Sequence, residues 1–158
     1  MVRFRGEFDS KVDSKGRFLL PVNLKKQLPE DANSRFVMNC GFEGCLNLFP
    51  LSEWEKIEEK LDELDMYDPD DREFMRMFTS GLTDLELDSS GRLLIPKRLL
   101  KWANIEKEIV LMAQFNRIEV WDSKRHIEAV SVDPKKYSGL GKVVMGKNSN
   151  SSNDANLP

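Results

Sequence analysis

An internal duplication constrains the fold of this chain more than any other feature. Residues 12–24 (VDSKGRFLLPVNL) and 87–99 (LDSSGRLLIPKRL) share Asp, Ser, Gly, Arg, Leu, Pro and Leu at corresponding positions, 75 residues apart. Residues 45–50 correspond to 117–122 at a separation of 72, so the connecting loops differ in length between the copies. A turn, strand, proline and helix that recur in the same order indicate a duplicated unit rather than a chance match.

Each copy predicts the same series of elements: strand, turn, strand, short helix and hairpin. Phe4, Phe8 and Val12 have the same parity, which is typical of a half-buried strand. Pro21 and Pro96 follow the next strand of each copy. A proline ends a strand and is favoured at N1, the first position of a helix, so we expect a short helix to begin at each of them.

Residues 52–81 join the two copies, and they predict two acidic helices. Ser52 and Glu55 have the spacing of a capping box, and Asp68 followed by Pro69 predicts the start of a second helix. Residues 52–77 hold eleven acidic and four basic side chains, a net charge of −7, so the rest of the chain carries +4 within the total of −3. The spread of these carboxylates favours a solvated helix face.

This organisation predicts a fold that is mainly β with flanking α helices, in the α+β class. One copy alone leaves open strand edges and an unburied face, so we expect the two copies to pair with each other. The prediction is a duplicated swapped-hairpin β-barrel, double-psi-like, with pseudo-twofold symmetry. Its parts are a first repeat (1–51), an acidic helical connector (52–81), a second repeat (82–145) and an Asn/Ser-rich tail expected to be disordered (146–158).

The composition excludes several functional classes. With 40% hydrophobic and 32% charged residues, the 158-residue chain resembles a soluble globular protein, and no apolar run is long enough to span a bilayer. No signal peptide is evident, so we expect a cytoplasmic protein. One histidine (His126) and two cysteines (Cys40 and Cys45) supply neither a metal-ligand set nor a catalytic constellation. We therefore predict no enzymatic activity, no cofactor and no membrane partner.

The repeated D-x-x-G-R turn is the sharpest chemical signature in the chain. Asp13 and Asp88 are expected to accept hydrogen bonds from the backbone of their own turns. Gly16 and Gly91 are expected to adopt a conformation that other residues avoid. We therefore predict a structural role for these four residues.

The basic residues around the turns are candidates for binding DNA. Arg17 and Arg92 follow the two turns, and a planar guanidinium matches phosphate oxygens or the O6 and N7 atoms of guanine. Lys15 adds a charge at the tip of the first turn, and Arg3 and Arg5 lie on the preceding strand. The alternative is that each arginine only pairs with the aspartate of its own turn and fixes the turn.

The order and spacing of these motifs resemble the MraZ family over about residues 1–145. The motifs are two copies of D-x-x-G-R-[FL]-L-[LI]-P, a segment CLNLFPLSEW (45–54) between them, and QFNRIEVWD (114–122) near the end. MraZ proteins belong with the SpoVT/AbrB-like swapped-hairpin barrels. The resemblance implies a bacterial transcriptional regulator of the division and cell-wall gene cluster, including its own promoter. It also implies ring-shaped homo-oligomers and association with the nucleoid.

The resemblance assigns DNA contact to Lys15, Arg17 and Arg92. Ser90 stands where the first turn has Lys15, so equal participation of the two turns is not expected. A ring of about eight or more subunits would present the same patch repeatedly, and subunits roughly 34 Å apart would read direct repeats in promoter DNA. Two alternatives stay open: an adaptor that binds proteins without contacting DNA, and a barrel enzyme, for which we find no catalytic set.

Overall fold

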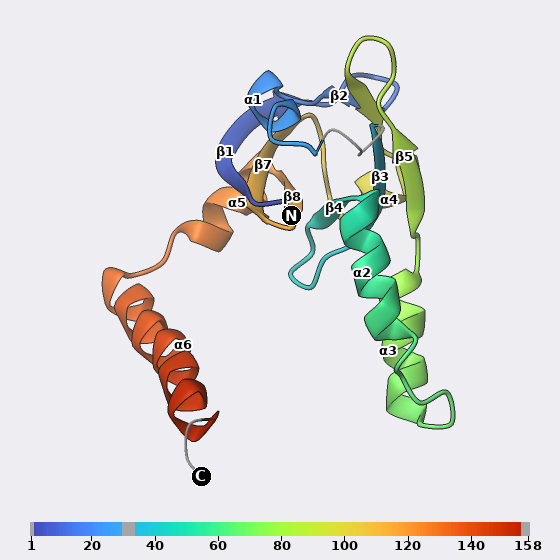
Figure 1. Cartoon of the computed structure of the whole chain (residues 1–158). Helices are drawn as coiled ribbons and strands as arrows, with labels where there is room; N and C mark the ends of the chain where they lie inside the picture. Colours follow the sequence, from blue (N-terminus) through green and yellow to red (C-terminus); the bar gives the residue numbers. More distant parts are fainter. Residues whose placement is uncertain (1, 30–33, 156–158) are drawn as a thin grey trace. The chain divides into compact units, whose positions relative to one another are not determined.

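Strands from both repeats build the body of the molecule (Figure 1). The computed structural model describes residues 2–29 and 34–155, with residues 148–155 as backbone only. The chain forms two compact units, residues 1–123 and 124–158. The first unit contains both repeats as far as the last strand, so the predicted α+β class is confirmed, whereas the predicted division into four parts stays a prediction.

The two halves of the chain contain the same elements in the same order. The first half comprises β1 (Phe4–Lys11), β2 (Arg17–Leu19), α1 (Val22–Lys25), β3 (Arg35–Cys40), β4 (Leu46–Pro50), α2 (Leu51–Leu61) and α3 (Pro69–Thr79). The second half comprises β5 (Thr83–Glu86), β6 (Arg92–Leu94), α4 (Lys97–Trp102), β7 (Glu108–Phe115), β8 (Arg117–Asp122), α5 (Ser123–Val130) and α6 (Pro134–Ala155). The duplication therefore extends beyond the strands, with α5 in the place of α2 and α6 in the place of α3.

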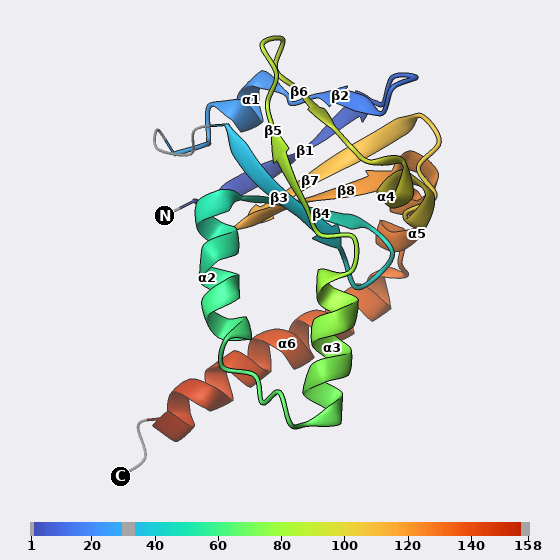
Figure 2. The same ribbon diagram turned by 90° about the vertical axis from the view of Figure 1, so that its right-hand side faces the viewer.

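Strand pairing runs between the repeats and is symmetric. Six strands form a sheet in the order β1-β7-β8-β4-β3-β5, and β2 pairs with β6 as a separate two-stranded ribbon (Figure 2). When each strand is replaced by its counterpart in the other repeat, the same strand order results, read from the opposite edge of the sheet. A pseudo-twofold axis therefore passes between β4 and β8 and between β2 and β6. At the axis, Asn47 pairs with Glu119 and Phe18 pairs with Leu93. The hairpins of the two repeats interleave as predicted.

Closure of the sheet into a barrel is not detected. The sheet ends at β1 on one side and at β5 on the other, and no strand ladder joins these two edges within the described ranges. The β2–β6 ribbon and helices α1 and α4 instead cover one face of the sheet. Because this second layer buries the apolar face, the core is completed without hydrogen bonding between the edge strands.

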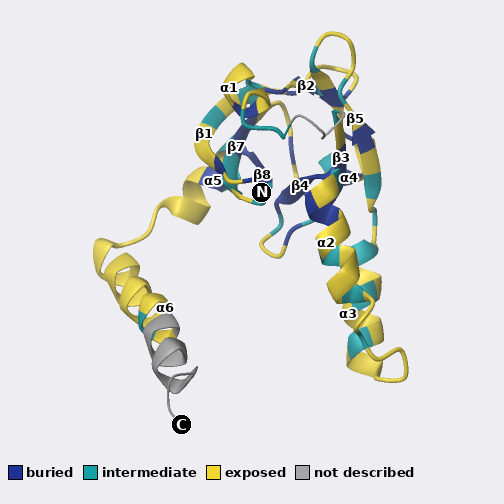
Figure 3. Cartoon of the chain, in the orientation of Figure 1, coloured by how far each residue is buried: buried dark blue, intermediate teal, exposed yellow. Residues whose placement is uncertain are grey.

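The main core lies between the sheet and the ribbon. Phe18 and Leu93 of the ribbon are fully buried, together with Leu24 of α1 and Leu99 of α4. Burial of one such side chain contributes about 1.5–3 kcal/mol. The opposite face of the sheet carries a smaller cluster in which Trp54 of α2 packs against β3 and β4. The central strands are therefore covered on both faces, and Figure 3 shows the buried residues concentrated in the sheet.

Three predicted helix starts differ from the observed ones. The prolines before α1 and α4 occupy the N-cap position rather than N1, and the same holds for the proline before α2. The capping box at Ser52 is wrong, because α2 already begins at Leu51 and no side chain caps it. The start of α3 is confirmed: the carboxylate of Asp68 accepts a hydrogen bond from the backbone N–H of Asp70 at 2.9 Å.

The second unit contains α6, which begins in the same way as α3. The carboxylate of Asp133 accepts a hydrogen bond from the backbone N–H of Lys135 at 2.9 Å. The helix continues to Ala155, into the segment predicted to be disordered, although Asn and Ser are weak helix formers; residues 156–158 lie outside the described residues. Within the described residues, no helix combines the length and the apolarity that a membrane crossing requires.

The contact across the pseudo-twofold axis is tested by a double-mutant cycle. Phe18→Ala and Leu93→Ala each remove a fully buried side chain, and we expect each to lower the free energy of unfolding by about 2–5 kcal/mol. Because the two residues face each other, the double variant should lose less than the sum of the single losses. Urea unfolding measures all three variants. Phe18→Ala combined with Val37→Ala, which lies in the other cluster, should be additive, and equal additivity in both pairs would contradict the pairing.

Candidate nucleic-acid interface

The two D-x-x-G-R turns are held by matching hydrogen bonds. The Oδ1 atom of Asp13 accepts from the backbone N–H groups of Lys15 and Arg17, each at 2.9 Å. The Oδ1 atom of Asp88 accepts from the backbone N–H groups of Ser90 and Arg92, also at 2.9 Å. Each aspartate thus satisfies two backbone donors that the tight turn would otherwise leave unpaired.

The turn glycines connect each repeat to the other. Gly16 and Gly91 have φ angles of 91° and 78°, in the region that favours glycine. The carbonyl of Gly16 accepts from the backbone N–H of Ile95 at 2.8 Å, and that of Gly91 accepts from Leu20 at 3.0 Å. Space is tighter at the first turn, because a Cβ atom on Gly16 would lie 2.8 Å from the carbonyl oxygen of Ile95.

The same hydrogen bonds alter the acidity of the turn aspartates. The backbone N–H of Arg17 lowers the pKa of Asp13, with further contributions from Lys15 and from the Arg17 side chain. The pKa of Asp88 is lowered first by the backbone N–H of Arg92 and then by the Ser90 hydroxyl. The charge of Arg17 also lowers the pKa of Asp88, so the two turns share one electrostatic environment.

The outer face of the β2–β6 ribbon presents two arginines and two leucines. Side chains alternate along a strand, so burial of Phe18 and Leu93 directs their neighbours outward. Arg17 pairs with Leu94, and Arg92 pairs with Leu19. The two arginines are therefore diagonal neighbours across the ribbon, with their Cα atoms roughly 7–8 Å apart. Leu19 and Leu94 are 49% and 51% exposed. Neither leucine is among the residues that the sequence predicts to bind DNA, although the alternation within each short strand could have identified them.

The two arginines differ in their contacts. The Nε atom of Arg17 donates to Oδ2 of Asp13 at 3.1 Å, so the alternative in which the arginine fixes its own turn describes this residue in part. In the second turn the Ser90 hydroxyl bonds to Asp88 at 2.8 Å, and within the described part of the chain the Arg92 guanidinium forms no ion pair. Arg92 is the more exposed of the two arginines.

The other residues predicted to bind DNA differ in their distance from the β2–β6 ribbon. Lys15 is exposed at the tip of the first turn, beside Arg17. Arg5 and Arg3 lie at the opposite end of β1 from the turn, and Arg5 is six residues from Lys11, about 20 Å along the strand. The structure therefore brings Lys15, Arg17 and Arg92 to one ribbon and places Arg3 and Arg5 elsewhere.

The cysteines are unsuited to ligation or redox chemistry at neutral pH. Burial raises the pKa of Cys45 to about 12 and also raises the pKa of Cys40, so both thiols stay protonated. Both are free of disulfide bonds. In the parts of the chain that the structure describes, no three His, Cys, Asp or Glu side chains are grouped so that they could hold a metal ion.

The fold and this ribbon define a class: duplicated α+β proteins in which two hairpin units interleave and jointly expose a basic turn surface. A family model described as "MraZ protein, putative antitoxin-like" matches residues 3–77 and 78–131, one match for each half. The chain belongs to the MraZ family.

Curated relatives match nearly the whole chain. A protein of Christiangramia forsetii named Transcriptional regulator MraZ is 37% identical over 147 residues, which cover 92% of this chain and 95% of the relative. A protein of Flavobacterium psychrophilum with the same name is 39% identical over 142 residues, which cover 89% of this chain and 90% of the relative.

The different space around the two turn glycines predicts unequal effects of substitution. Gly16→Ala should destabilise more than Gly91→Ala, because both add strain at positive φ but only the first brings Cβ within 2.8 Å of a backbone oxygen. The strain alone costs roughly 1–2 kcal/mol. Urea denaturation of the two variants measures the difference. Equal losses would show that the carbonyl of Ile95 does not crowd the first turn.

The lowered acidity of the turn aspartates predicts a pH dependence of stability. A depressed native pKa adds stability above the unfolded pKa of about 3.9, and this stability is lost as the pH falls through the native value. The double variant Asp13→Asn/Asp88→Asn keeps one acceptor oxygen at each position for the backbone donors but removes the charge, so its Tm should be lower at pH 7 and should approach that of the wild type below about pH 4. Asp62→Asn is the control. A Tm difference that is constant with pH would contradict the charge effect.

Proposed function

We propose that this protein is a sequence-specific DNA-binding transcriptional regulator that reads DNA with the outer face of the β2–β6 ribbon. One observation carries the proposal: Arg17 and Arg92 stand on a single exposed two-stranded ribbon, one from each repeat. The major groove of B-DNA admits a two-stranded ribbon, and arginine is the commonest reader of guanine there. The names of the curated relatives, both Transcriptional regulator MraZ, support regulation of transcription.

Each side chain of the ribbon has a suitable role in this proposal. Arg92 and Arg17 donate to O6 and N7 of guanine, and Lys15 binds a phosphate beside the groove. The exposed leucines Leu19 and Leu94 contact thymine methyl groups, which gives their exposure a function.

The distribution of charge fits an approach to DNA from the ribbon side. The acidic residues of 52–77 lie on α2, α3 and their connection, which pack on the sheet face opposite the ribbon. The net charge of −7 in this segment is therefore separated from the DNA by the body of the protein, and salt screens it over roughly 8–10 Å. The negative total charge of the chain is compatible with DNA binding for this reason.

The proposed targets and assembly follow from membership in the MraZ family. The protein regulates the division and cell-wall gene cluster, including its own promoter, and acts in the cytoplasm at the nucleoid. Two or three basic side chains per copy bind weakly, since each neutralised phosphate contributes a salt slope of only about −0.9. A homo-oligomeric ring that engages direct repeats raises the affinity by roughly 10²–10⁴ without a new kind of contact. Catalysis, cofactors and membranes have no part in the proposal.

The distant residues Arg3 and Arg5 have a lesser place in this proposal. Both are exposed at the far end of β1, so they reach phosphates outside the groove that the ribbon reads. Their replacement should weaken binding equally on all sequences, whereas replacement of the ribbon arginines should relax specificity.

An adaptor function is the second candidate, and exposed apolar residues on α3 favour it. Phe74 and Met77 are 40% and 66% exposed. Such a surface fits contact with protein rather than with DNA. Protein partners that stay bound after nuclease treatment, together with the absence of salt-dependent binding to DNA, would support the adaptor and oppose the regulator.

The regulator proposal predicts a selective loss of DNA binding. Arg17→Ala and Arg92→Ala should each weaken binding to upstream DNA of the protein's own operon by about 5–150-fold, which corresponds to 1–3 kcal/mol for a bidentate guanine contact. Fluorescence anisotropy across a salt series measures the affinity and its slope. Arg76→Ala removes the same charge from α3 and should leave the affinity unchanged. Circular dichroism checks that each variant remains folded.

The loss should be larger on promoter DNA than on unrelated duplex of the same length. Unchanged affinity of both ribbon variants at moderate salt would exclude the ribbon as the reading element. A loss of equal size for Arg76→Ala would show a general effect of charge instead.

A further inference from the structure

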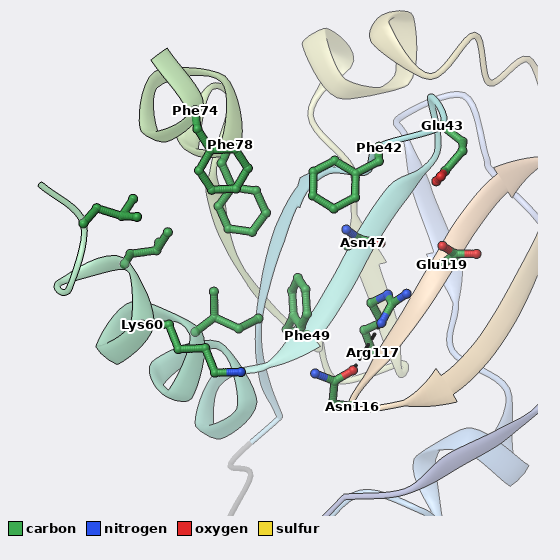
Figure 4. Close-up of a pocket in the computed structure, with 13 residues that line it drawn as sticks. Phe42, Glu43, Asn47, Phe49, Lys60, Phe74, Phe78, Asn116, Arg117 and Glu119 are labelled. Atoms are coloured by element: carbon green, nitrogen blue, oxygen red, sulfur yellow. Dashed lines mark hydrogen bonds between the residues drawn. The ribbon is translucent and has the colours of Figure 1, made fainter. Parts of the chain in front are cut away.

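The helices α2 and α3 and the outer face of the sheet enclose a groove of about 450 Å³ (Figure 4). One wall consists of the aromatic residues Phe42, Phe74 and Phe78; the rings of Phe74 and Phe78 stack at 5.2 Å and those of Phe42 and Phe78 at 6.3 Å. The facing wall is aliphatic and belongs to α2, with Ile57 and Leu61 among its residues. A groove of this size accommodates two or three apolar side chains.

Two features of the groove favour an occupant. Phe42 and Phe74 are 78% and 40% exposed, which leaves a continuous aromatic surface in water. Asn47 also lines the groove, and within the described residues its buried amide oxygen has no hydrogen-bond partner. An occupant with apolar side chains and one hydrogen-bond donor satisfies both features.

The charged side chains that line the groove are balanced, with Glu43 and Glu119 against Lys60 and Arg117, and an acidic rim lies outside this lining. Helical periodicity places Glu58 beside the groove face of α2, and Asp70 and Asp71 beside the groove face of α3. The surrounding segment 52–77 has a net charge of −7. A basic occupant is therefore attracted to the rim.

Helix α6 of the same chain has the complementary surface. Tyr137, Leu140 and Val144 lie on one helix face at spacings of three and four, with exposures of 74%, 52% and 52%. Residues 134–147 hold four lysines and no acidic side chain, and Lys136 and Lys147 flank this apolar face. Tyr137 also provides a hydroxyl donor.

Intrinsic propensity gives α6 little stability of its own. Gly139, Gly141 and Gly146 interrupt it, and no neighbouring atom lies within 4 Å of a Cβ built on any of the three. Glycine is the weakest helix former after proline, and isolated helices draw most of their stability from packing of an apolar face. The helix is thus suited to form fully against a partner.

We propose that α6 of one copy binds in the α2–α3 groove of a neighbouring copy, with Tyr137, Leu140 and Val144 on the aromatic wall and the lysines at the acidic rim. The contact is head to tail, so repetition produces a ring if the rotation between copies closes. This inference rests on the proposed self-assembly and names the surfaces that perform it.

Charge reversal on either surface tests the contact. Lys136→Glu/Lys147→Glu should reduce the subunit number of the full chain by at least half in sedimentation velocity at moderate salt. Glu58→Lys/Asp70→Lys on the groove rim should do the same. The matched control is Lys25→Glu/Lys26→Glu on α1, which changes the charge equally at two exposed positions and should retain the wild-type assembly.

Mixing distinguishes contact between copies from contact within one copy. A rim-reversed copy and a helix-reversed copy complement each other at both junctions of an alternating ring, so an equal mixture should regain the wild-type subunit number. If α6 instead bound the groove of its own copy, mixing the two variants could not restore that contact. Failure of the mixture to reassemble would overturn the proposal. Tyr137→Ala/Leu140→Ala, which leaves the charge unchanged, should also dissociate the assembly, and retention of the full assembly by this variant would overturn it as well.

The DNA-binding measurement separates this inference from the proposed function. If charge reversal leaves assembly intact while Arg17→Ala still weakens promoter binding, the α6 contact is wrong and the regulator proposal stands. If the helix variants dissociate the assembly but the assembled wild-type protein does not bind promoter DNA, the interface stands and the regulator proposal fails.

Discussion

The fold depends on two reciprocal hydrogen bonds that cross between the repeats. The carbonyl of Gly16 binds the backbone of Ile95, and the carbonyl of Gly91 binds the backbone of Leu20. Neither repeat can make such a bond alone, because the donor always belongs to the other copy. The turn that looks local in the sequence therefore joins the halves, and the positive φ of its glycine brings the carbonyl close enough to pair.

The same pairing determines what the surface presents. Once Phe18 and Leu93 face each other in the core, strand alternation leaves the arginine and the leucine of each repeat on the outer face of the ribbon. Stability and the proposed DNA contact consequently arise from one register. A slip by one residue would bury the arginines and expose the aromatic ring, so the core itself specifies the outward orientation of Arg17 and Arg92.

The sequence predicts the local parts of this structure well and the long-range parts less well. The Asp13 turn and the Asp68 cap involve atoms within four residues of each other, so short motifs specify them. Whether the sheet closes into a barrel depends on pairing between distant segments, whereas the distance of Arg5 from the turn follows from the length of β1. The Ser52 capping box failed because packing of Trp54 and the buried Pro50 starts α2 earlier than the local signal indicates.

Duplication combined with divergence would allow a nearly symmetric body to form the proposed head-to-tail assembly. Positions on the axis must fit one another, so the ribbon and the sheet retain twofold pairing. The helices that follow β4 and β8 are free of this constraint, and they differ in charge: α2 and α3 are acidic, whereas α6 is basic. Helices of identical charge after both strands would favour a closed dimer in which like surfaces meet. Helices of opposite charge instead favour contact between unlike surfaces; in the proposed assembly this contact would extend from copy to copy and would present the ribbon at regular intervals along DNA.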